Sequence, residues 1–304
     1  MIKKIIVFGG SGMVGSNLRL ESENTEYDFS FPTRKEIDLL NSKKTKIYLK
    51  KHKPDLIINL AGKVGGIKAN MIDNYGFLKE NITINLNLIE SAKDSGIKNF
   101  LNISSSCIYP KDQINLLKES DILTNVLEPT NEGYAIAKIS ALKLCEYVTN
   151  QFGFNYKTFI PCNLYGPYDK FNEDAHMIPA VINRVHRAMK AKCDKIEMWG
   201  DGTARREFMY VGDFIDFLIF SLSKFKELPK IMNVGLGRDY SINEYYNSII
   251  KIVGYGGKVI KNLNQPIGMK KKQVDISEQI SLGWKPNHTL IQGIKKTYNY
   301  YQKL

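Results

Sequence analysis

Short apolar runs alternate with helical patterns through the first half of the chain, and this alternation restricts the fold more than any other feature. Buried strands are expected within residues 3–10 (KKIIVFGG), 55–62 (DLIINLAG) and 98–106 (KNFLNISSS). Residues 81–96 (NITINLNLIESAKDSG) place apolar side chains three and four apart and end at Gly96, which is typical of an amphipathic helix with a C-terminal glycine. Strands that alternate with helices predict an α/β, doubly wound parallel sheet covered on both faces.

The composition narrows the choice of partners. The chain has 304 residues, 43% of them hydrophobic, which is enough for one large domain or two linked ones. Its formal charge is +12, with lysines concentrated in residues 43–53 and 269–273. Basic charge suits phosphate-bearing ligands as well as nucleic acid, and neither stretch shows the repeated aromatic residues of single-strand binders. We therefore expect no nucleic-acid partner and interpret residues 43–53 as a solvated helix face.

Cysteine spacing and the N-terminus indicate a reduced compartment. None of the four cysteines forms a C-x-x-C pair, so the sequence predicts neither a zinc site nor a disulfide framework. The cysteines are Cys107, Cys145, Cys162 and Cys193. The apolar stretch at the N-terminus ends at Gly9-Gly10, too early for a signal peptide, and no run is long enough to cross a bilayer. We expect a cytoplasmic protein with no metal and no membrane contact.

A glycine-rich turn follows the first predicted strand and precedes an amphipathic stretch. It consists of Gly9, Gly10, Ser11, Gly12, Met13, Val14 and Gly15. Glycines let the backbone approach a pyrophosphate closely, and the N-terminus of the next helix then stabilises the phosphate charge. The alternative is a glycine-rich turn with no ligand, but the position after the first strand favours a dinucleotide site.

The end of the second strand indicates which dinucleotide would bind. That strand is expected within residues 26–34 (EYDFSFPTR), followed by Lys35. NAD sites place an acid here for the ribose hydroxyls, whereas a cation suits the 2′-phosphate of NADP. Asp28 lies at the wrong end of the strand, so Arg34 favours NADP(H) as the cofactor. Alternatively, Arg34 only caps a surface turn.

Residues 128–146 (EPTNEGYAIAKISALKLCE) place Tyr134 and Lys138 four apart in a helical pattern. Their side chains would project from one helix face, with the ammonium near the phenol. A phenol has a pKa of about 10, and a neighbouring cation would lower it toward a value useful for proton transfer. The alternative is an ordinary half-exposed helix face, since such a pair is common by chance.

The order of glycine turn, serine-terminated strand and Tyr-x-x-x-Lys resembles the short-chain dehydrogenase/reductases, in the extended form that acts on nucleotide sugars. Within that superfamily the sequence is most similar to the GDP-L-fucose synthase family, the epimerase/reductases of GDP-4-keto-6-deoxymannose. The similar stretches are GGSGMVGS, NLAGKVGGI, SSCIYP, EPTNEGYAIAK, NLYGP, HMIPA, WGDGTARREF and LGWKP. The resemblance implies a Rossmann domain (1–165 plus about 205–235) and a smaller C-terminal α/β domain for the sugar nucleotide (166–204 and 236–304).

The resemblance also implies catalytic roles. Ser105, Tyr134 and Lys138 would form the reductase triad, with Ser105 and Tyr134 holding the ketone oxygen as hydride arrives at the carbon. Strand alternation disfavours Ser104 and Ser106, the neighbours of Ser105. A C4 ketone acidifies the hydrogens on C3 and C5, and Cys107 and His176 match the family's acid/base pair for inverting those centres. The alternatives are a buried, packing Cys107 and a surface or capping His176; the other three cysteines are interpreted as packing.

The resemblance further implies the binding residues. Besides the glycine turn, the cofactor would contact Arg34, Ile103, Ser104, Lys138, Pro161, Asn163, Leu164 and His176. The substrate, a GDP-4-keto-sugar, would contact Arg184, Trp199, Arg206 and Lys272, with Lys271 a further candidate for the diphosphate. The family forms homodimers through two long helices, so a homodimer is implied as well.

Several departures from the family pattern leave the sugar open between a 4-keto-6-deoxyhexose and a 4-keto-heptose. Gly212 stands where an aspartate is usual, which would leave Asp213 to cap its helix. Asn262 replaces an acid before the Pro-x-Gly segment at 266–268, and the segment at Gly62 is one residue shorter than usual.

Two other classes remain as alternatives. A nucleotide-sugar 4-epimerase or 4,6-dehydratase would retain NAD, and dehydratases place acids after the catalytic hydroxyl, where this chain has Ser106 and Cys107. A non-catalytic cofactor sensor on the same fold would be free to lose Tyr134 or Lys138, and this chain keeps both.

Overall fold

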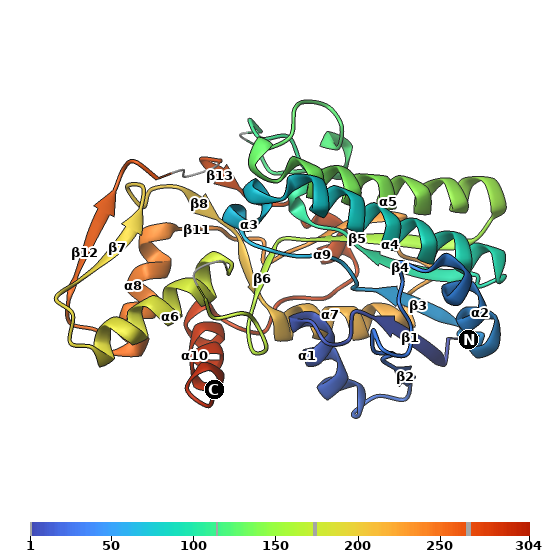
Figure 1. Cartoon of the computed structure of the whole chain (residues 1–304), viewed down its shortest axis with the longest axis horizontal. Coiled ribbons are helices and arrows are strands. Elements are labelled where there is room, and N and C mark those ends of the chain that lie inside the picture. The colour runs from blue at the N-terminus through green and yellow to red at the C-terminus, as the bar shows by residue number, and fades with distance from the viewer. Residues whose placement is uncertain (1, 114, 173–174, 266–268) are drawn as a thin grey trace.

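The computed structural model describes residues 2–113, 115–172, 175–265 and 269–304 (Figure 1). Its centre is a six-stranded sheet in which every neighbouring pair is parallel. In spatial order the strands are β10 (Ile231–Val234), β5 (Asn155–Pro161), β4 (Asn99–Ile103), β3 (Leu56–Asn59), β1 (Lys4–Phe8) and β2 (Asp28–Ser30). The predicted parallel sheet and its first strands are confirmed.

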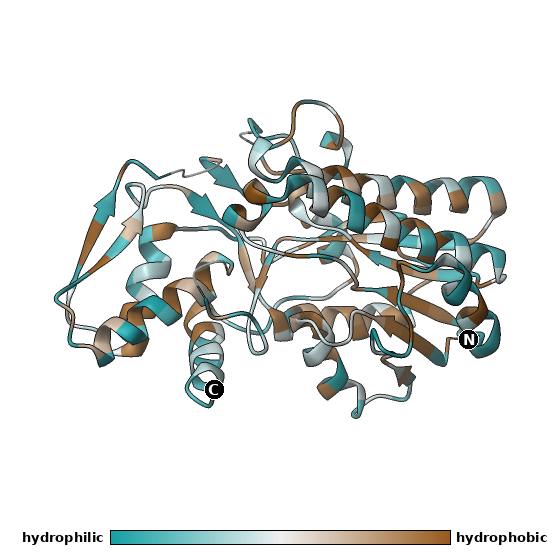
Figure 2. Cartoon of the chain, viewed as in Figure 1, coloured by the Kyte–Doolittle hydropathy of each residue, from teal (hydrophilic) through white to brown (hydrophobic). Residues whose placement is uncertain are grey.

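Helices cover both faces of this sheet, as the alternation predicted. One face carries α1 (Met13–Ser22) and α7 (Val211–Ser223), and the other carries α2 (Ser42–His52), α4 (Asn74–Asp94) and α5 (Glu132–Phe152). In β1, Ile5 and Val7 pack on the first face and Ile6 and Phe8 on the second. All four are buried because a parallel strand between two helical layers has no solvated side, and Figure 2 shows the resulting hydrophobic strands under mixed helix surfaces.

The basic stretch at residues 43–53 forms most of α2, with Thr45 and Leu49 buried and most lysines exposed. The solvated helix face is therefore confirmed. The helix predicted over residues 81–96 is longer at its start, because α4 begins at Asn74. Gly96 follows its end with φ of +72°, a left-handed conformation that glycine adopts without strain.

The later segments build a smaller unit beside the sheet, at the left of Figure 1. Its main elements are α6 (Met177–Lys190), β7 (Lys195–Trp199), α8 (Ile242–Val253), β12 (Lys258–Asn262) and α10 (Leu290–Tyr301). Short elements complete the described chain: α3 (Ile67–Ile72), β6 (Asn163–Tyr165), β8 (Arg205–Arg206), β9 (Phe208–Tyr210), β11 (Tyr240–Ser241), β13 (Lys271–Lys272), α9 (Ser277–Ser281) and the 3₁₀ turns Ser106–Ile108, Glu119–Asp121 and Pro129–Asn131.

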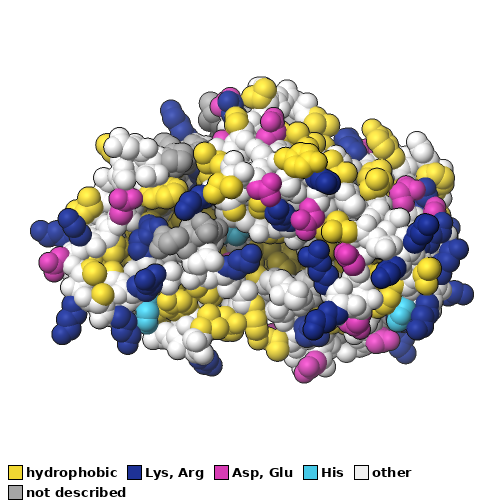
Figure 3. Space-filling view, in the orientation of Figure 1, with side chains coloured by type: hydrophobic (Ala, Val, Ile, Leu, Met, Phe, Trp, Pro, Cys, Tyr) yellow, Lys and Arg dark blue, Asp and Glu magenta, His cyan; other side chains and the backbone are white. Residues whose placement is uncertain are grey.

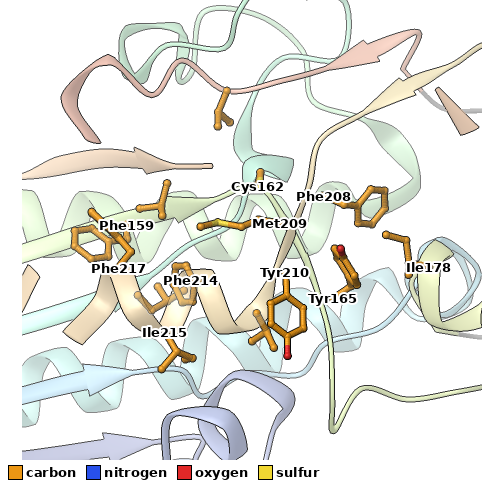
Figure 4. Close-up of a cluster of buried hydrophobic side chains, with 14 of the residues drawn as sticks. Phe159, Cys162, Tyr165, Ile178, Phe208, Met209, Tyr210, Phe214, Ile215 and Phe217 are labelled. Atoms are coloured by element: carbon orange, nitrogen blue, oxygen red, sulfur yellow. The ribbon is translucent and has the colours of Figure 1, made fainter. Parts of the chain in front are cut away.

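An apolar cluster runs from the sheet into the β6–β9 pair (Figure 4). Phe159 of β5 and Phe217 of α7 pack with ring centres 5.4 Å apart, and Cys162 joins the same cluster. The packing role predicted for Cys145 and Cys162 is confirmed, since both are buried. Cys193 is exposed instead, because it lies in the surface connection between α6 and β7.

The carboxylate of Asp213 does not cap its own helix. It accepts hydrogen bonds from the backbone N–H groups of Asn287 and His288, at 3.1 and 3.2 Å. It thereby ties α7 to the chain that leads into α10. A side chain at Gly212 would place its Cβ 2.5 Å from the ring of Tyr210, which explains why glycine rather than aspartate stands there.

Among the residues that the structure describes, no helix is both long and apolar enough to span a bilayer. No cluster of three or more His, Cys, Asp or Glu side chains suited to a metal ion occurs among them either.

Candidate active site

The glycine turn lies at the carboxyl end of β1. In the sheet β1 lies between β2 and β3, so the direction in which successive strands are added reverses at β1. Gly9 has φ of +86°, and a Cβ there would lie 2.6 Å from the backbone of Leu60. A Cβ on Gly15 would lie 2.4 Å from the carbonyl oxygen of Gly9. Gly12 begins α1 without any side-chain cap, so the helix N-terminus keeps backbone N–H groups available to an anion. The turn therefore fits a dinucleotide diphosphate.

Ser105, Tyr134 and Lys138 come together where the end of β4 meets the start of α5. The ammonium of Lys138 donates a hydrogen bond to the carbonyl of Ile103 at 2.8 Å. It lies 5.7 Å from the centre of the Tyr134 ring. Phe77 of α4 packs edge-on against that ring, with centres 6.3 Å apart. Two helices and one strand thus fix the phenol and the ammonium at the carboxyl edge of the sheet.

The structure distinguishes the three adjacent serines. Ser104 and Ser106 are 4% and 2% exposed, whereas Ser105 is only partly buried. The hydroxyl of Ser105 accepts a hydrogen bond from the N–H of Cys107 at 3.4 Å. Within the described chain, the buried hydroxyl of Ser104 has no hydrogen-bond partner. An unpaired buried hydroxyl at this edge fits a polar group of the cofactor, because leaving it unpaired costs free energy.

Burial controls the titration of the central pair. Desolvation raises the pKa of Tyr134 well above its ordinary value, and the thiol of Cys107 adds to that effect. The expectation that Lys138 lowers the tyrosine pKa is therefore wrong for this structure, in which the ammonium is bound to the Ile103 carbonyl. Burial also lowers the pKa of Lys138 to about 8.

We expect Lys138→Met to stabilise the folded protein near neutral pH. The folded-state pKa of about 8 lies below the ordinary lysine value of 10.5, so the unfolded state binds the extra proton between these pH values and wild-type stability rises with pH there. The gain in the variant should be complete below pH 8 and lost above 10.5. The variant also loses the hydrogen bond from Lys138 to Ile103, which offsets part of this gain. Urea unfolding should therefore show a net increase in the free energy of unfolding on the order of 1 kcal/mol. Equal stability of both proteins near neutral pH would contradict this expectation.

The charge of Lys272 acts on both Cys107 and His176. Burial raises the pKa of the Cys107 thiol, while Lys272, Ser105 and Lys138 oppose that shift. His176 directly precedes α6 as its N-cap residue, and its pKa is lowered first by desolvation and then by the charges of Lys272 and Lys170. A lowered pKa favours neutral imidazole, which can donate or accept a proton.

The chain at Pro167 and Tyr168, just after β6, is held by contacts with two distant helices, which the sequence patterns did not reveal. Asn17 of α1 donates to the carbonyl of Pro167 at 2.9 Å. Tyr168, in a left-handed conformation with φ of +66°, packs on Tyr300 of α10 with ring centres 4.7 Å apart. A non-glycine residue holds such a conformation only when its surroundings fix it.

The remaining candidate cofactor residues lie at the same sheet edge or at the end of β2. Pro161 ends β5, whose Phe159 pairs with Ile103 of β4, and Asn163 and Leu164 open β6. Ser104 directly follows β4, and its backbone N–H donates to the carbonyl of Phe159 at 2.8 Å. Arg34 follows β2 with its side chain 74% exposed and its Nε 4.0 Å from Asp38.

Two of the candidate substrate residues face each other. Arg206 of β8 is paired in register with Lys272 of β13. Glu207, which the sequence patterns did not single out, holds this arrangement. It is 1% exposed, and its two carboxylate oxygens accept backbone N–H bonds from Gly237 and Val274, both at 2.8 Å. Burial raises the pKa of Glu207 to about 7.

Arg184 and Trp199 form a second group, on the smaller unit. Arg184 donates to the carbonyl of Glu197 at 2.9 Å. Trp199 ends β7 with 39% of its surface exposed, and Asn262 lies opposite it in β12. The Pro-x-Gly segment at 266–268 lies outside the described residues. Figure 3 shows a hollow near the centre of the molecule, between this unit and the six-stranded sheet, with lysine and arginine side chains around it.

Comparisons with known proteins agree with this geometry. The model of the "NAD dependent epimerase/dehydratase family" matches residues 5–235. A GDP-L-colitose synthase of Yersinia pseudotuberculosis is 48% identical, covering 98% of this chain and 97% of its own. A GDP-L-fucose synthase of Azorhizobium caulinodans is 42% identical, covering 98% and 96%. A solved GDP-6-OMe-4-keto-L-xylo-heptose reductase from C. jejuni is 28% identical with a TM-score of 0.92, covering 99% and 98%. The chain belongs to the NAD dependent epimerase/dehydratase family, in the group that contains the GDP-L-fucose and GDP-L-colitose synthases.

Proposed function

We propose that this protein reduces the C4 ketone of a GDP-4-keto-sugar with NADPH, and that the same site inverts C5, or C3 and C5, of the sugar before reduction. The observation that carries the proposal is the meeting of Ser105, Tyr134, Lys138 and Cys107 at the sheet edge that also carries the glycine turn. Such an edge is where α/β proteins of this topology bind their ligands.

For the reduction, NADPH supplies a hydride when it is bound. Negative charge then develops on the ketone oxygen, and the hydroxyl of Ser105 and the phenol of Tyr134 stabilise it by hydrogen bonds. Tyr134 donates the proton that completes the alcohol. Its raised pKa keeps the phenol protonated until then, and Lys138 can turn from the Ile103 carbonyl toward the ribose hydroxyls.

For the inversion, the same two oxygen-binding groups would stabilise an enolate. Cys107 and His176 would remove and return hydrogens on the carbons beside the ketone. Lys272 favours the thiolate of Cys107 by its charge, and the low pKa of His176 leaves its imidazole neutral near pH 7. Arg184, Trp199, Arg206 and Lys272 would hold the GDP moiety, because guanidinium groups suit diphosphate and an indole suits a base or ribose face.

The relatives support the substrate class. The names of all three specify a GDP-sugar, while the sugars differ: colitose, fucose and a 4-keto-heptose. The two with the higher identities produce L-sugars, which supports inversion in addition to reduction. We therefore place a GDP-4-keto-6-deoxyhexose ahead of a heptose.

A substrate panel tests the proposal directly. Purified protein would be incubated with NADPH and GDP-4-keto-6-deoxymannose, its 3-deoxy analogue or a GDP-4-keto-heptose. The loss of NADPH absorbance reports reduction, and the stereochemistry of the product reports inversion. The proposal would be overturned if none of the three substrates led to oxidation of NADPH. It would also be overturned if the protein retained NAD tightly and reduced and reoxidised it within one turnover.

The cofactor preference is tested at Arg34. Arg34→Ala should raise the KM for NADPH far more than that for NADH, because only NADPH carries the 2′-phosphate that a guanidinium can bind. Steady-state kinetics with both cofactors would measure this. Equal effects on the two would assign Arg34 a structural role.

We also propose a homodimer that forms through α4 and α5. These helices lie side by side along one face of the molecule, and they expose Leu86, Ile136 and Tyr147 to solvent. A paired arrangement of both helices in two copies would cover these side chains.

A further inference from the structure

The guanidinium of Arg19 lies where the glycine turn meets the end of β2. Its central carbon lies 4.7 Å from the centre of the Phe31 ring. One of its terminal nitrogens lies 3.3 Å from the place that a Cβ on Gly10 would occupy. Arg19 belongs to α1 and Phe31 directly follows β2, so the contact joins the two elements that border an adenosine ribose in this fold.

Phe31 holds this junction together. Its side chain lies within 3.0 Å of the position of a Gly10 Cβ, so only glycine fits beneath it. The ring of Phe31 also stacks on that of Phe29, with ring centres 6.0 Å apart and planes at 18°. A guanidinium packed on a fixed aromatic ring keeps its N–H edge available to an anion.

Among the described residues just after β2, each carboxylate already has a hydrogen-bond partner, although the charge of Glu36 also reaches Arg19. Glu36, the nearest acid after β2 in the sequence, accepts hydrogen bonds from the N–H and hydroxyl of Thr33 at 2.8 and 2.7 Å. Asp28 begins β2 at the opposite end. Among the described residues, Arg19 has no salt bridge, and that of Arg34 is stretched to 4.0 Å.

We propose that Arg19 is a second cation for the 2′-phosphate of NADPH and a determinant of cofactor choice. Both side chains are exposed, but the guanidinium of Arg19 is held against the ring of Phe31, whereas that of Arg34 lies no nearer than 4.0 Å to Asp38 and must be ordered when the cofactor binds. The pre-positioned guanidinium of Arg19 therefore loses less conformational entropy per hydrogen bond than that of Arg34. This inference rests on the proposed use of NADPH.

The test measures binding rather than turnover, by the fluorescence of the reduced nicotinamide on titration with NADPH and with NADH. Arg19→Met removes the charge and keeps an apolar stem over Phe31. It should weaken NADPH binding roughly tenfold or more, in line with a lost charge-assisted hydrogen bond, and leave NADH binding within about twofold. Adenosine 2′,5′-bisphosphate should compete with NADPH less well in the variant by the same factor. Lys35→Met, at a neighbouring exposed cation, is the matched control and should change neither affinity.

Each other outcome overturns the inference. An equal loss for NADPH and NADH would mean that Arg19 supports the glycine turn through Phe31. Unchanged affinities would leave the 2′-phosphate to Arg34 alone. Equal binding of NADPH and NADH by the unmutated protein would refute the cofactor preference itself, whereas the reductase proposal would still be tested by NADH oxidation with the substrate panel.

Discussion

Tyr134→Phe is expected to lower turnover by roughly 10² or more while leaving NADPH affinity nearly unchanged. The substitution removes the proton donor and keeps the aromatic ring that packs against Phe77. Because burial raises the pKa of this phenol above its ordinary value, the wild-type group is protonated across the neutral range. The loss in the variant should therefore be nearly independent of pH across the neutral range.

The measurement compares single-turnover NADPH oxidation with the dissociation constant of NADPH for each protein. Tyr147→Phe is the matched control, since Tyr147 lies on the same helix but 13 residues from Tyr134, on the face proposed to contact a second copy, and its turnover should equal that of the wild type. Near-normal turnover in Tyr134→Phe would refute the assignment of the proton donor. A large loss of NADPH binding would instead show that the phenol is needed to build the cofactor site.

Features set by neighbouring residues could be predicted from the sequence. The period of the apolar side chains located the buried strands and the helix that became α4. The glycine turn could be located because its conformation depends on residues only a few positions apart, as the close approach of Gly15 to Gly9 shows. Ser105 is less buried than Ser104 and Ser106. Strand alternation is not the reason, because β4 ends at Ile103 and Ser106 begins a 3₁₀ turn.

Features that depend on distant segments were not predicted, or were predicted wrongly. The ammonium of Lys138 was expected to act on Tyr134, but it is bound to a carbonyl 35 residues earlier in the chain. The carboxylate of Asp213 was expected to cap a helix, but it binds a segment more than 70 residues later. Glu207 joins two segments that no local pattern connects. In each case the partner comes near only when the sheet and the smaller unit have assembled.

The second large effect is expected at Cys107, which separates inversion from reduction. If its thiolate is the base, Cys107→Ser should abolish exchange of the sugar's C3 or C5 hydrogens with deuterated water, because a hydroxyl is a far weaker acid and its anion is not formed near neutral pH. Reduction of an already inverted 4-keto sugar should be largely unchanged, since it needs only Ser105, Tyr134 and Lys138. Burial raises the pKa of the wild-type thiol, so the thiolate fraction, and with it the exchange rate, should rise with pH through the neutral range.

Mass spectrometry of the product formed in deuterated water decides between a working and a packing role for this thiol. Cys193→Ser is the control, because Cys193 is exposed and lies outside the site, and it should leave exchange intact. His176→Asn should also impair inversion, since an amide can hydrogen-bond but cannot supply the proton. Deuterium on carbon in the wild-type product, and its absence in Cys107→Ser, would establish the thiol as part of the acid/base pair. No deuterium on carbon even with the unmutated protein would mean that the site reduces without inverting and that Cys107, 7% exposed, is there for packing.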